Sequence, residues 1–239
     1  MIMSDDKLLA RNKKYGDKFK KVLDLRYEPV AIRLIRENEE FPDYDVPEKQ
    51  MSHCQAVMNA KNGSAFNLPG SVHDCKVGAS ALGICDTPEK VRNGEFHFGM
   101  GAHDTVEATA AMIAARSEIP FRTKGAAYAP LSMATFEPDV VIFEDMPERL
   151  YWFVPLFTAE PGGRINFSTA PFQAACVDTT AIPMMTGKPN MSLGCFGCRK
   201  RTDIQKDELI MGVPFELIPG MVKRLDKYKD GMMTKAKRD

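Results

Sequence analysis

Short apolar segments alternate with longer amphipathic segments along this sequence. The segments Pro29–Ile35 and Asp139–Phe143 are short and rich in β-branched residues, which is typical of buried strands. Residues 4–25 repeat apolar side chains at a helical spacing, and residues 104–117 are rich in alanine and end before Pro120. Because such strands and helices follow one another, we expect an α/β fold with a mixed sheet flanked by helices.

The same patterns place the remaining elements. They predict further strands at 65–68, 126–136, 164–167 and 208–214, and further helices at 48–62, 147–157, 171–185 and 215–228. The chain has 239 residues and is 44% hydrophobic, which is enough to bury one sizeable core. We therefore expect a single globular domain over residues 1–239, in which 229–239 is a flexible basic tail.

The net charge and the N-terminal residues indicate which classes of protein this chain is unlike. Lys plus Arg and Asp plus Glu each total 32, so the net charge gives no attraction to nucleic acid or to an anionic membrane. The first residues are charged and helix-forming, unlike a signal peptide. No apolar run reaches the roughly 18 to 20 residues of a membrane span. These observations predict a soluble cytoplasmic protein that binds neither nucleic acid nor membrane.

The six cysteines are the residues best suited to carry chemistry. In a chain without a secretion signal they are poor candidates for disulfides, because cytosolic thiols are kept reduced. Metal binding or thiol chemistry is favoured instead. Free cysteine also packs as a small hydrophobic residue, and Cys85, which has no evident partner in the sequence, is expected to be structural.

Four of the cysteines fall into two similar arms. Cys54 opens one predicted helix, and an extended segment then leads to Cys75. Cys176 opens another predicted helix, and an extended segment then leads to Cys195 at nearly the same separation. This similarity suggests pseudo-duplicated cysteine arms within one domain.

Four thiolates are the ligand set of a 4Fe-4S cluster or of a structural zinc ion. The CxxC spacing of zinc knuckles occurs once, at Cys195 and Cys198, and the CxxCxxC run of ferredoxins is missing. A cluster held by dispersed cysteines is still physically sensible, because a large fold can position ligands without a local loop. Cys54, Cys75, Cys176 and Cys195 are therefore the candidate metal ligands.

Two histidines and a basic run lie beside these cysteines. His53 and His73 could join the coordination, bond to a sulfide or shuttle a proton, although for either one taken singly an ordinary hydrogen bond is the favoured alternative. Arg199, Lys200 and Arg201 follow the CxxC pair, and nearby cations lower the pKa of a thiol. Arg199, His73 and His53 are therefore candidate cofactor-binding residues.

Several motifs together resemble one known family, the domain of unknown function 169. They are Pro29-Val-Ala-Ile-Arg-Leu, Cys54-Gln-Ala-Val, Cys75-x-x-Gly-Ala with Ala81-Leu-Gly, Glu137-Pro-Asp-Val-Val-Ile-Phe, Ser192-x-Gly-Cys-Phe-Gly with Arg199, and Asp207-Glu-Leu-x-Met-Gly-Val-Pro. The resemblance spans residues 29–214. It implies a protein type common in archaea and anaerobic bacteria, without a settled function, that carries cysteine at the four candidate ligand positions. At Cys198 the family often has serine, which argues against a shared CxxC redox pair.

Three functional hypotheses remain. The leading one is a 4Fe-4S protein that serves electron transfer or reduction of a small substrate, with a redox partner protein or small molecule as its partner. The second is a zinc or soft-metal binding and sensing module without redox turnover. The third is thiol catalysis at Cys195 or Cys198, with His53 or His73 as the base. The amphipathic first and last helices also leave room for a homo-oligomer.

Overall fold

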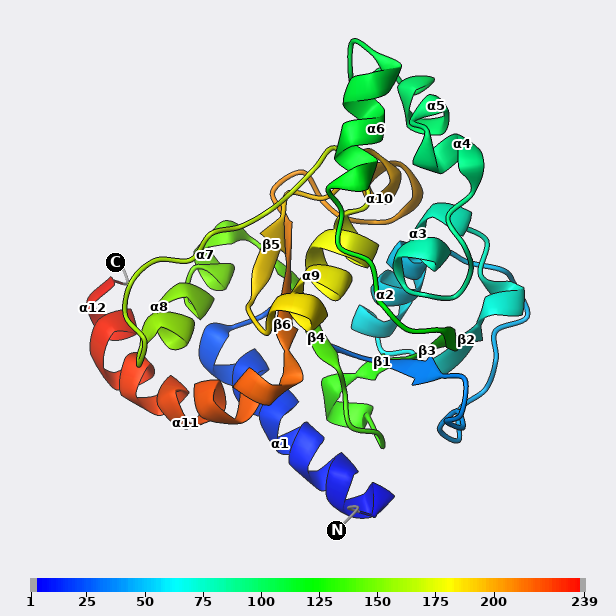
Figure 1. Cartoon of the computed structure of the whole chain (residues 1–239). Helices are drawn as coiled ribbons and strands as arrows, with labels where there is room; N and C mark the ends of the chain where they lie inside the picture. Colours follow the sequence, from blue (N-terminus) through cyan, green and yellow to red (C-terminus); the bar gives the residue numbers. More distant parts are fainter. Residues whose placement is uncertain (1–3, 237–239) are drawn as a thin grey trace.

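Six antiparallel strands form one sheet through the middle of the molecule, as the computed structural model of residues 4–236 shows (Figure 1). The strands are β1 (Val30–Arg36), β2 (Phe66–Pro69), β3 (Thr123–Pro130), β4 (Val140–Asp145), β5 (Asn190–Ser192) and β6 (Leu209–Pro214), in the spatial order β2-β3-β1-β4-β6-β5. The α/β class is confirmed. All five strand pairings are antiparallel, so the sheet is not the expected mixed one.

Helices cover both faces of the sheet. They are α1 (Asp5–Leu23), α2 (His53–Lys61), η1 (Gly70–Val72), α3 (Lys76–Ala81), α4 (Glu89–Arg92), α5 (Glu95–Phe98), α6 (Val106–Ala114), η2 (Leu131–Met133), α7 (Pro147–Leu150), α8 (Phe153–Thr158), the π-helix η3 (Ala174–Ala181), α9 (Ile182–Thr186), α10 (Phe196–Arg201), η4 (Phe215–Leu217), α11 (Ile218–Tyr228), the π-helix η5 (Lys229–Met233) and α12 (Thr234–Ala236). No helix within residues 4–236 is long and apolar enough to cross a membrane.

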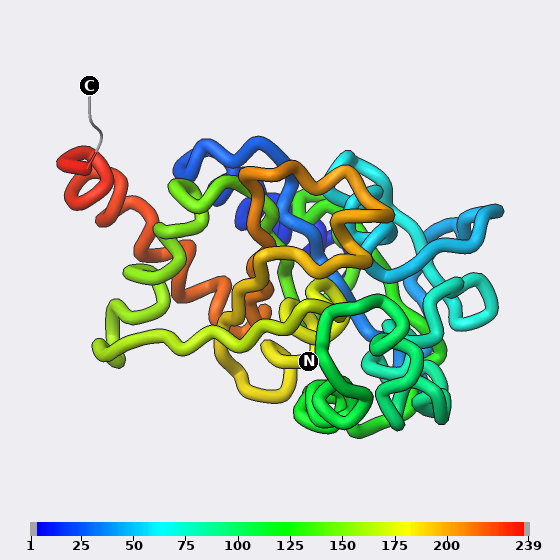
Figure 2. Tube along the Cα trace, turned by 90° about the horizontal axis from the view of Figure 1, so that it is seen from above, coloured from blue at the N-terminus to red at the C-terminus, as the bar shows by residue number. Residues whose placement is uncertain are grey.

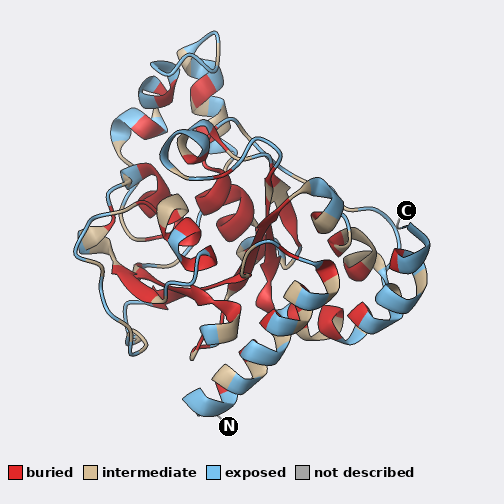
Figure 3. Ribbon diagram, turned by 180° about the vertical axis from the view of Figure 1, so that it is seen from behind, coloured by how far each residue is buried: buried red, intermediate tan, exposed pale blue. Residues whose placement is uncertain are grey.

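Side chains alternate between the two faces of the sheet and pack into two separate hydrophobic cores. On β1, Ala31 and Ile35 face a core formed with α1, α8 and α11, whereas Ile32 and Leu34 face a core formed with α2, α3 and η3. Figure 3 shows the buried sheet between these two helical layers. Because both faces of the sheet are buried, its strands are apolar along their whole length. Such continuous apolar strands are typical of parallel sheets, but here they form an antiparallel one.

The two halves of the chain repeat one arrangement. The first half runs β1, α2, β2, α3, β3, and the second runs β4, η3 with α9, β5, α10, β6, with α7 and α8 inserted between β4 and η3. In each half the third strand lies between the other two, and β1 pairs with β4 at the centre. The pseudo-duplicated cysteine arms are therefore part of a duplicated βαβαβ scaffold.

The halves also differ in the segment between their second helix and their third strand. After α10 a short loop, residues 202–208, leads directly into β6, whereas after α3 residues 82–122 form a helical excursion that contains α4, α5 and α6. This excursion stands at the top of Figure 1, and Figure 2 shows it beside the segment that leads into η3. The excursion therefore adds a wall to one end of the duplicated scaffold.

Several local expectations need correction. The predicted strand at 164–167 is an irregular segment, and Ser168, which follows it, exchanges hydrogen bonds with the side chain of Asn190. The helix predicted at 171–185 begins as the π-helix η3. Residues 229–236 of the predicted tail continue the last helix and bury Met233, while residues 237–239 lie outside the described part of the chain.

Candidate functional site

A cavity of about 750 Å³ opens between the ends of the two cysteine arms and the excursion. Five of the six cysteines line it: Cys54, Cys75, Cys176, Cys195 and Cys198. They come from α2, the start of α3, η3 and α10, so folding gathers thiols from four separate segments. All four of the ligand candidates lie in this cavity, and every cysteine of the chain is a free thiol.

Backbone hydrogen bonds hold the two helices of each arm together. In the first arm, Met51 accepts a bond from the N–H of Asp74 at 3.1 Å, which ties the residues before α2 to those before α3. In the second arm, Pro171 accepts a bond from the N–H of Phe196 at 3.0 Å, which ties the residues before η3 to the start of α10. Cysteines far apart in sequence are thereby brought to one end of the fold.

Corresponding cysteines take the same local role in the two arms. Cys75 is the N-cap of α3, and its Sγ accepts the N–H of Gly78 at 3.4 Å. Cys195 is the N-cap of α10, and its Sγ accepts the N–H of Cys198 at 3.3 Å. An N-cap side chain accepts hydrogen bonds from helix N–H groups that otherwise have no partner, and such bonds favour the thiolate form.

The other two candidate ligands lie in the longer helices. Cys54 is in the first turn of α2, which begins with a capping box between Ser52 and Gln55. Cys176 lies in the π-helix η3, close to Gly78 of α3: its Sγ lies 3.7 Å from the position that a Cβ at Gly78 would take. The start of α3 therefore packs close to the thiol of Cys176.

Sulfur atoms contact one another on one side of the cavity. Cys195 Sγ and Cys198 Sγ are 3.4 Å apart, and Cys54 packs in the same cluster. Within residues 4–236, no three His, Cys, Asp or Glu side chains are arranged to hold a single metal ion as they stand. A bound ion or cluster would therefore require these side chains to adjust.

Hydrogen bonding and burial divide the thiols into two kinds. The hydrogen bond from Cys198 lowers the pKa of Cys195 to about 5 and that of Cys54 to about 7. The same two hydrogen bonds raise the pKa of Cys198 itself well above the usual value. Burial raises the pKa of Cys75, and that of Cys176 more strongly. Cys195 is thus the thiol that ionises most readily.

The charged side chains around the cavity are mostly basic. Lys76, Lys90, Lys200 and Arg201 line it, and the acidic residue among them, Asp74, is paired with Arg201 at 2.5 Å. Positive charge beside thiolates stabilises their ionised form and attracts anions. The cavity is therefore suited to hold an anionic group.

Both candidate histidines are buried near the thiols and neutral. His53 lines the cavity, but its ring nitrogens are engaged by Tyr128 Oη at 2.7 Å and Thr180 Oγ1 at 3.0 Å, and burial lowers its pKa to about 3. His73 Nδ1 accepts the N–H of Cys75 at 3.3 Å, its Nε2 has no hydrogen-bond partner within residues 4–236, and burial lowers its pKa to about 4.

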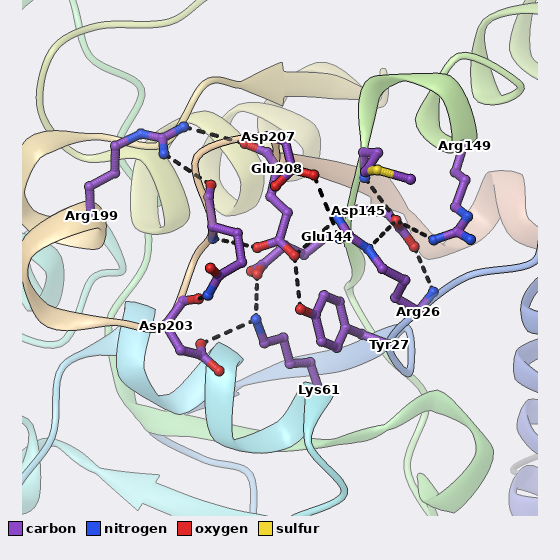
Figure 4. A network of polar contacts seen from close by, with 12 residues as sticks. Arg26, Tyr27, Lys61, Glu144, Asp145, Arg149, Arg199, Asp203, Asp207 and Glu208 are labelled. Atoms are coloured by element: carbon purple, nitrogen blue, oxygen red, sulfur yellow. Dashed lines mark hydrogen bonds and ion pairs between the residues drawn. The ribbon is translucent and has the colours of Figure 1, made fainter.

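Arg199 does not line the cavity. Its guanidinium donates to the carbonyl oxygens of Leu193, Gln205 and Glu208, and so fixes the loop between α10 and β6 (Figure 4). Lys200 and Arg201, the next two residues of α10, line the cavity instead. Cys85 also lies outside the cavity, with its thiol near the carbonyl of Lys76.

Sequence reasoning missed the aromatic and amide side chains of this cavity. Phe96 and His97 reach it from the excursion, Phe172 and Gln173 from the residues before η3, and Phe196 from α10. The run Phe96-His97-Phe98 was the visible signal, because aromatic residues around a histidine are unusual in an exposed connecting segment.

Comparisons with known proteins place the chain in a family. The model of the domain of unknown function 169, described as uncharacterised ArCR, matches residues 18–224. An uncharacterized protein of Methanocaldococcus jannaschii is 27% identical over 203 residues, which cover 84% of this chain and 87% of that protein. No solved structure matches the chain. On the extent of the family match, the chain belongs to the family of the domain of unknown function 169.

Proposed function

We propose that this protein is an iron-sulfur protein that holds a 4Fe-4S cluster through Cys54, Cys75, Cys176 and Cys195. The observation that carries the proposal is the convergence of five thiols from four separate segments on one cavity. Thiolates are the usual ligands of such clusters. The fold has a full hydrophobic core, so its stability does not require several free thiols at one place.

The surroundings of the thiols support this chemistry. A 4Fe-4S cluster with four thiolate ligands carries net negative charge, so hydrogen bonds to sulfur and nearby cations stabilise it and raise its reduction potential. The backbone N–H groups of Gly78 and Cys198 donate to Cys75 and Cys195. The basic side chains of Lys76 and Arg201 line the same cavity.

Cys198 has a different role in this proposal. Hydrogen bonding with Cys195 and Cys54 raises the pKa of its thiol well above the usual value. A 4Fe-4S cluster takes four thiolates, so one of the five thiols is left over. The family resemblance carries cysteine at the other four positions and often has serine at the position of Cys198. We therefore assign Cys198 to hydrogen bonding of the ligand sulfurs. The cluster would supply one-electron chemistry, with a redox partner protein as electron donor or acceptor, or with a small substrate in the cavity.

Anaerobic purification followed by analysis of iron, acid-labile sulfide and visible absorption tests this proposal. We expect about four iron and four sulfide per chain and a brown colour, and loss of both in each single serine variant of the four ligands. Cys85→Ser is the matched control, since Cys85 lies outside the cavity, and should keep its iron. A colourless protein without iron after anaerobic reconstitution would reject the proposal. Stoichiometric zinc without absorption would replace it with the metal-binding module.

One observation favours a second candidate, thiol chemistry at the CxxC pair. Cys195 has a pKa lowered to about 5 and contacts the sulfur of Cys198 at 3.4 Å, as in dithiol redox sites. His53 is not free to act as its base, because both ring nitrogens are engaged. In this case alkylation of Cys195 would abolish function in the protein whether or not it contains metal, and the iron analysis would distinguish the two candidates.

A further inference from the structure

The thiol-lined cavity continues into a compartment with aromatic walls. The rings of His97 and Phe172 are 4.6 Å apart, and those of Phe172 and Phe196 are 6.4 Å apart. Phe96 packs edge-on to His97 at 5.1 Å, and it lines the cavity with Met100. This aromatic row is continuous with the thiols, because Phe196 directly follows Cys195 in the chain. We call it the aromatic compartment, defined by Phe96, His97, Met100, Phe172, Gln173 and Phe196.

Two buried polar atoms in this compartment have no partner. Gln173 is only 7% exposed and its Nε2 makes no hydrogen bond within residues 4–236, and His97 is 3% exposed with an unpaired Nδ1. Unpaired polar atoms of this kind are rare in folded proteins and point to an absent partner. Because Nε2 of a glutamine can only donate, the missing partner of Gln173 must be an acceptor.

The backbone at Gln173 strengthens this argument. Gln173 has a φ of 71°, one of two positive values among the non-glycine residues at positions 4–236. A left-handed conformation is unfavourable for a residue with a Cβ atom, and it persists only where the surrounding structure imposes it. In the chain, this residue lies between Phe172 of the aromatic row and the helix η3 that carries Cys176, and it lines the cavity that they share.

Unpaired positive charge lies beside the same compartment. Lys90 of the excursion and Lys200 of α10 both line the cavity, and neither forms an ion pair within the described residues. The Nζ of Lys200 lies 5.7 Å from the centre of the Phe196 ring. Aromatic walls, a donor without an acceptor and free ammonium groups together describe a site for a flat apolar molecule that carries an anionic acceptor group.

We propose that the aromatic compartment binds a small aromatic carboxylate, with its ring among Phe96, Phe172 and Phe196 and its carboxylate toward the amide of Gln173 and the lysines. The binding of this molecule by the compartment is independent of the proposed function. Only its role as the substrate of the cluster rests on the proposed function. The excursion supports the assignment, because it has no counterpart in the second half of the scaffold and supplies Lys90, Phe96 and His97.

Ligand-observed NMR titrations with benzoate and 2-naphthoate test the inference, on anaerobically prepared protein whose iron content is measured in the same sample. We expect at least one of these carboxylates to bind, and benzamide and acetate to bind more weakly. Gln173→Glu should weaken binding by about tenfold or more, because an acceptor and a negative charge replace the donor. Phe96→Ala should weaken binding several-fold. Phe98→Ala, on the same helix but outside the cavity, is the matched control and should bind as the wild type does.

The outcomes separate this inference from the proposed function. If protein without iron binds a carboxylate and the variants behave as expected, the inference about the compartment is supported and the proposed cluster is rejected. If iron and sulfide are present and neither carboxylate binds, the inference is overturned and the cluster stands. Equal binding by Gln173→Glu, Phe98→Ala and wild type, each verified as folded by its thermal transition, would also overturn it.

Discussion

Gly212 of β6 controls how closely the helix that carries Cys176 approaches the sheet. A Cβ atom at this position would stand 1.9 Å from the carbonyl oxygen of Thr179 and 2.6 Å from its carbonyl carbon. Both are backbone atoms of η3, so no side-chain rotation relieves the clash. In Gly212→Ala, η3 and β6 must therefore separate by about 1 Å to reach even the shortest tolerated Cβ contact, 3.0 Å, and further to reach an ordinary one.

We expect Gly212→Ala to lower the free energy of unfolding by about 3 kcal/mol, the upper end of the range for overpacked cores. It should also lower iron content, because η3 carries Cys176. The assay is urea unfolding of the metal-free protein under reducing conditions, with iron analysis of a separate anaerobic preparation. Gly231→Ala is the control, since nothing lies within 4 Å of its added Cβ, and it should change stability by less than about 1 kcal/mol. If Gly212→Ala were as stable as the wild type and held full iron, the close approach of η3 to the sheet would be refuted.

Three further predictions rest on individual contacts. Burial raises the pKa of Glu144 from 4.5 to about 7, although Lys61 contacts its carboxylate (Figure 4). Between pH 4.5 and 7, Glu144 is therefore protonated in the folded state and ionised in the unfolded chain. Relative to Glu144→Gln, the wild type should therefore lose about 3 kcal/mol of unfolding free energy from pH 4.5 to 7 in urea titrations; a gain would mean that Lys61 keeps Glu144 ionised. Ser52→Ala removes the N-cap of α2 and should lower unfolding free energy by about 1 kcal/mol in the same assay; an unchanged value would contradict the cap. Cys198→Ser keeps a hydrogen-bonding group beside Cys195 and should retain iron with a shifted reduction potential in voltammetry, whereas iron loss would make Cys198 a ligand.

Local patterns were sufficient to predict most of the elements. The β-branched run that became β1 and the amphipathic periodicity that became α1 each depend on residues close in sequence. Whether strands pair parallel or antiparallel does not depend on residues close in sequence. It depends on which strands become neighbours in the folded sheet. The apolar run of β4 indicated a buried strand correctly, but helices on both faces produce the same burial in an antiparallel sheet.

The candidate site was predictable to the extent that it repeats. The similar separations of Cys54 from Cys75 and of Cys176 from Cys195 indicated two arms, and the structure brings all four to one cavity. Arg199 was misplaced because its neighbours in sequence gave no sign that three carbonyl groups would bind its guanidinium. His97 and Gln173 were missed because they reach the cavity only when the excursion folds back against the residues before η3.

X-ray absorption at the iron edge, on anaerobically purified wild type and on Cys176→Ser, tests the central claim most directly. The account predicts iron surrounded by sulfur with further iron atoms as close neighbours in the wild type, and loss of this signature in the variant. Iron bound by nitrogen or oxygen without neighbouring iron, or an identical spectrum in Cys176→Ser, would contradict it.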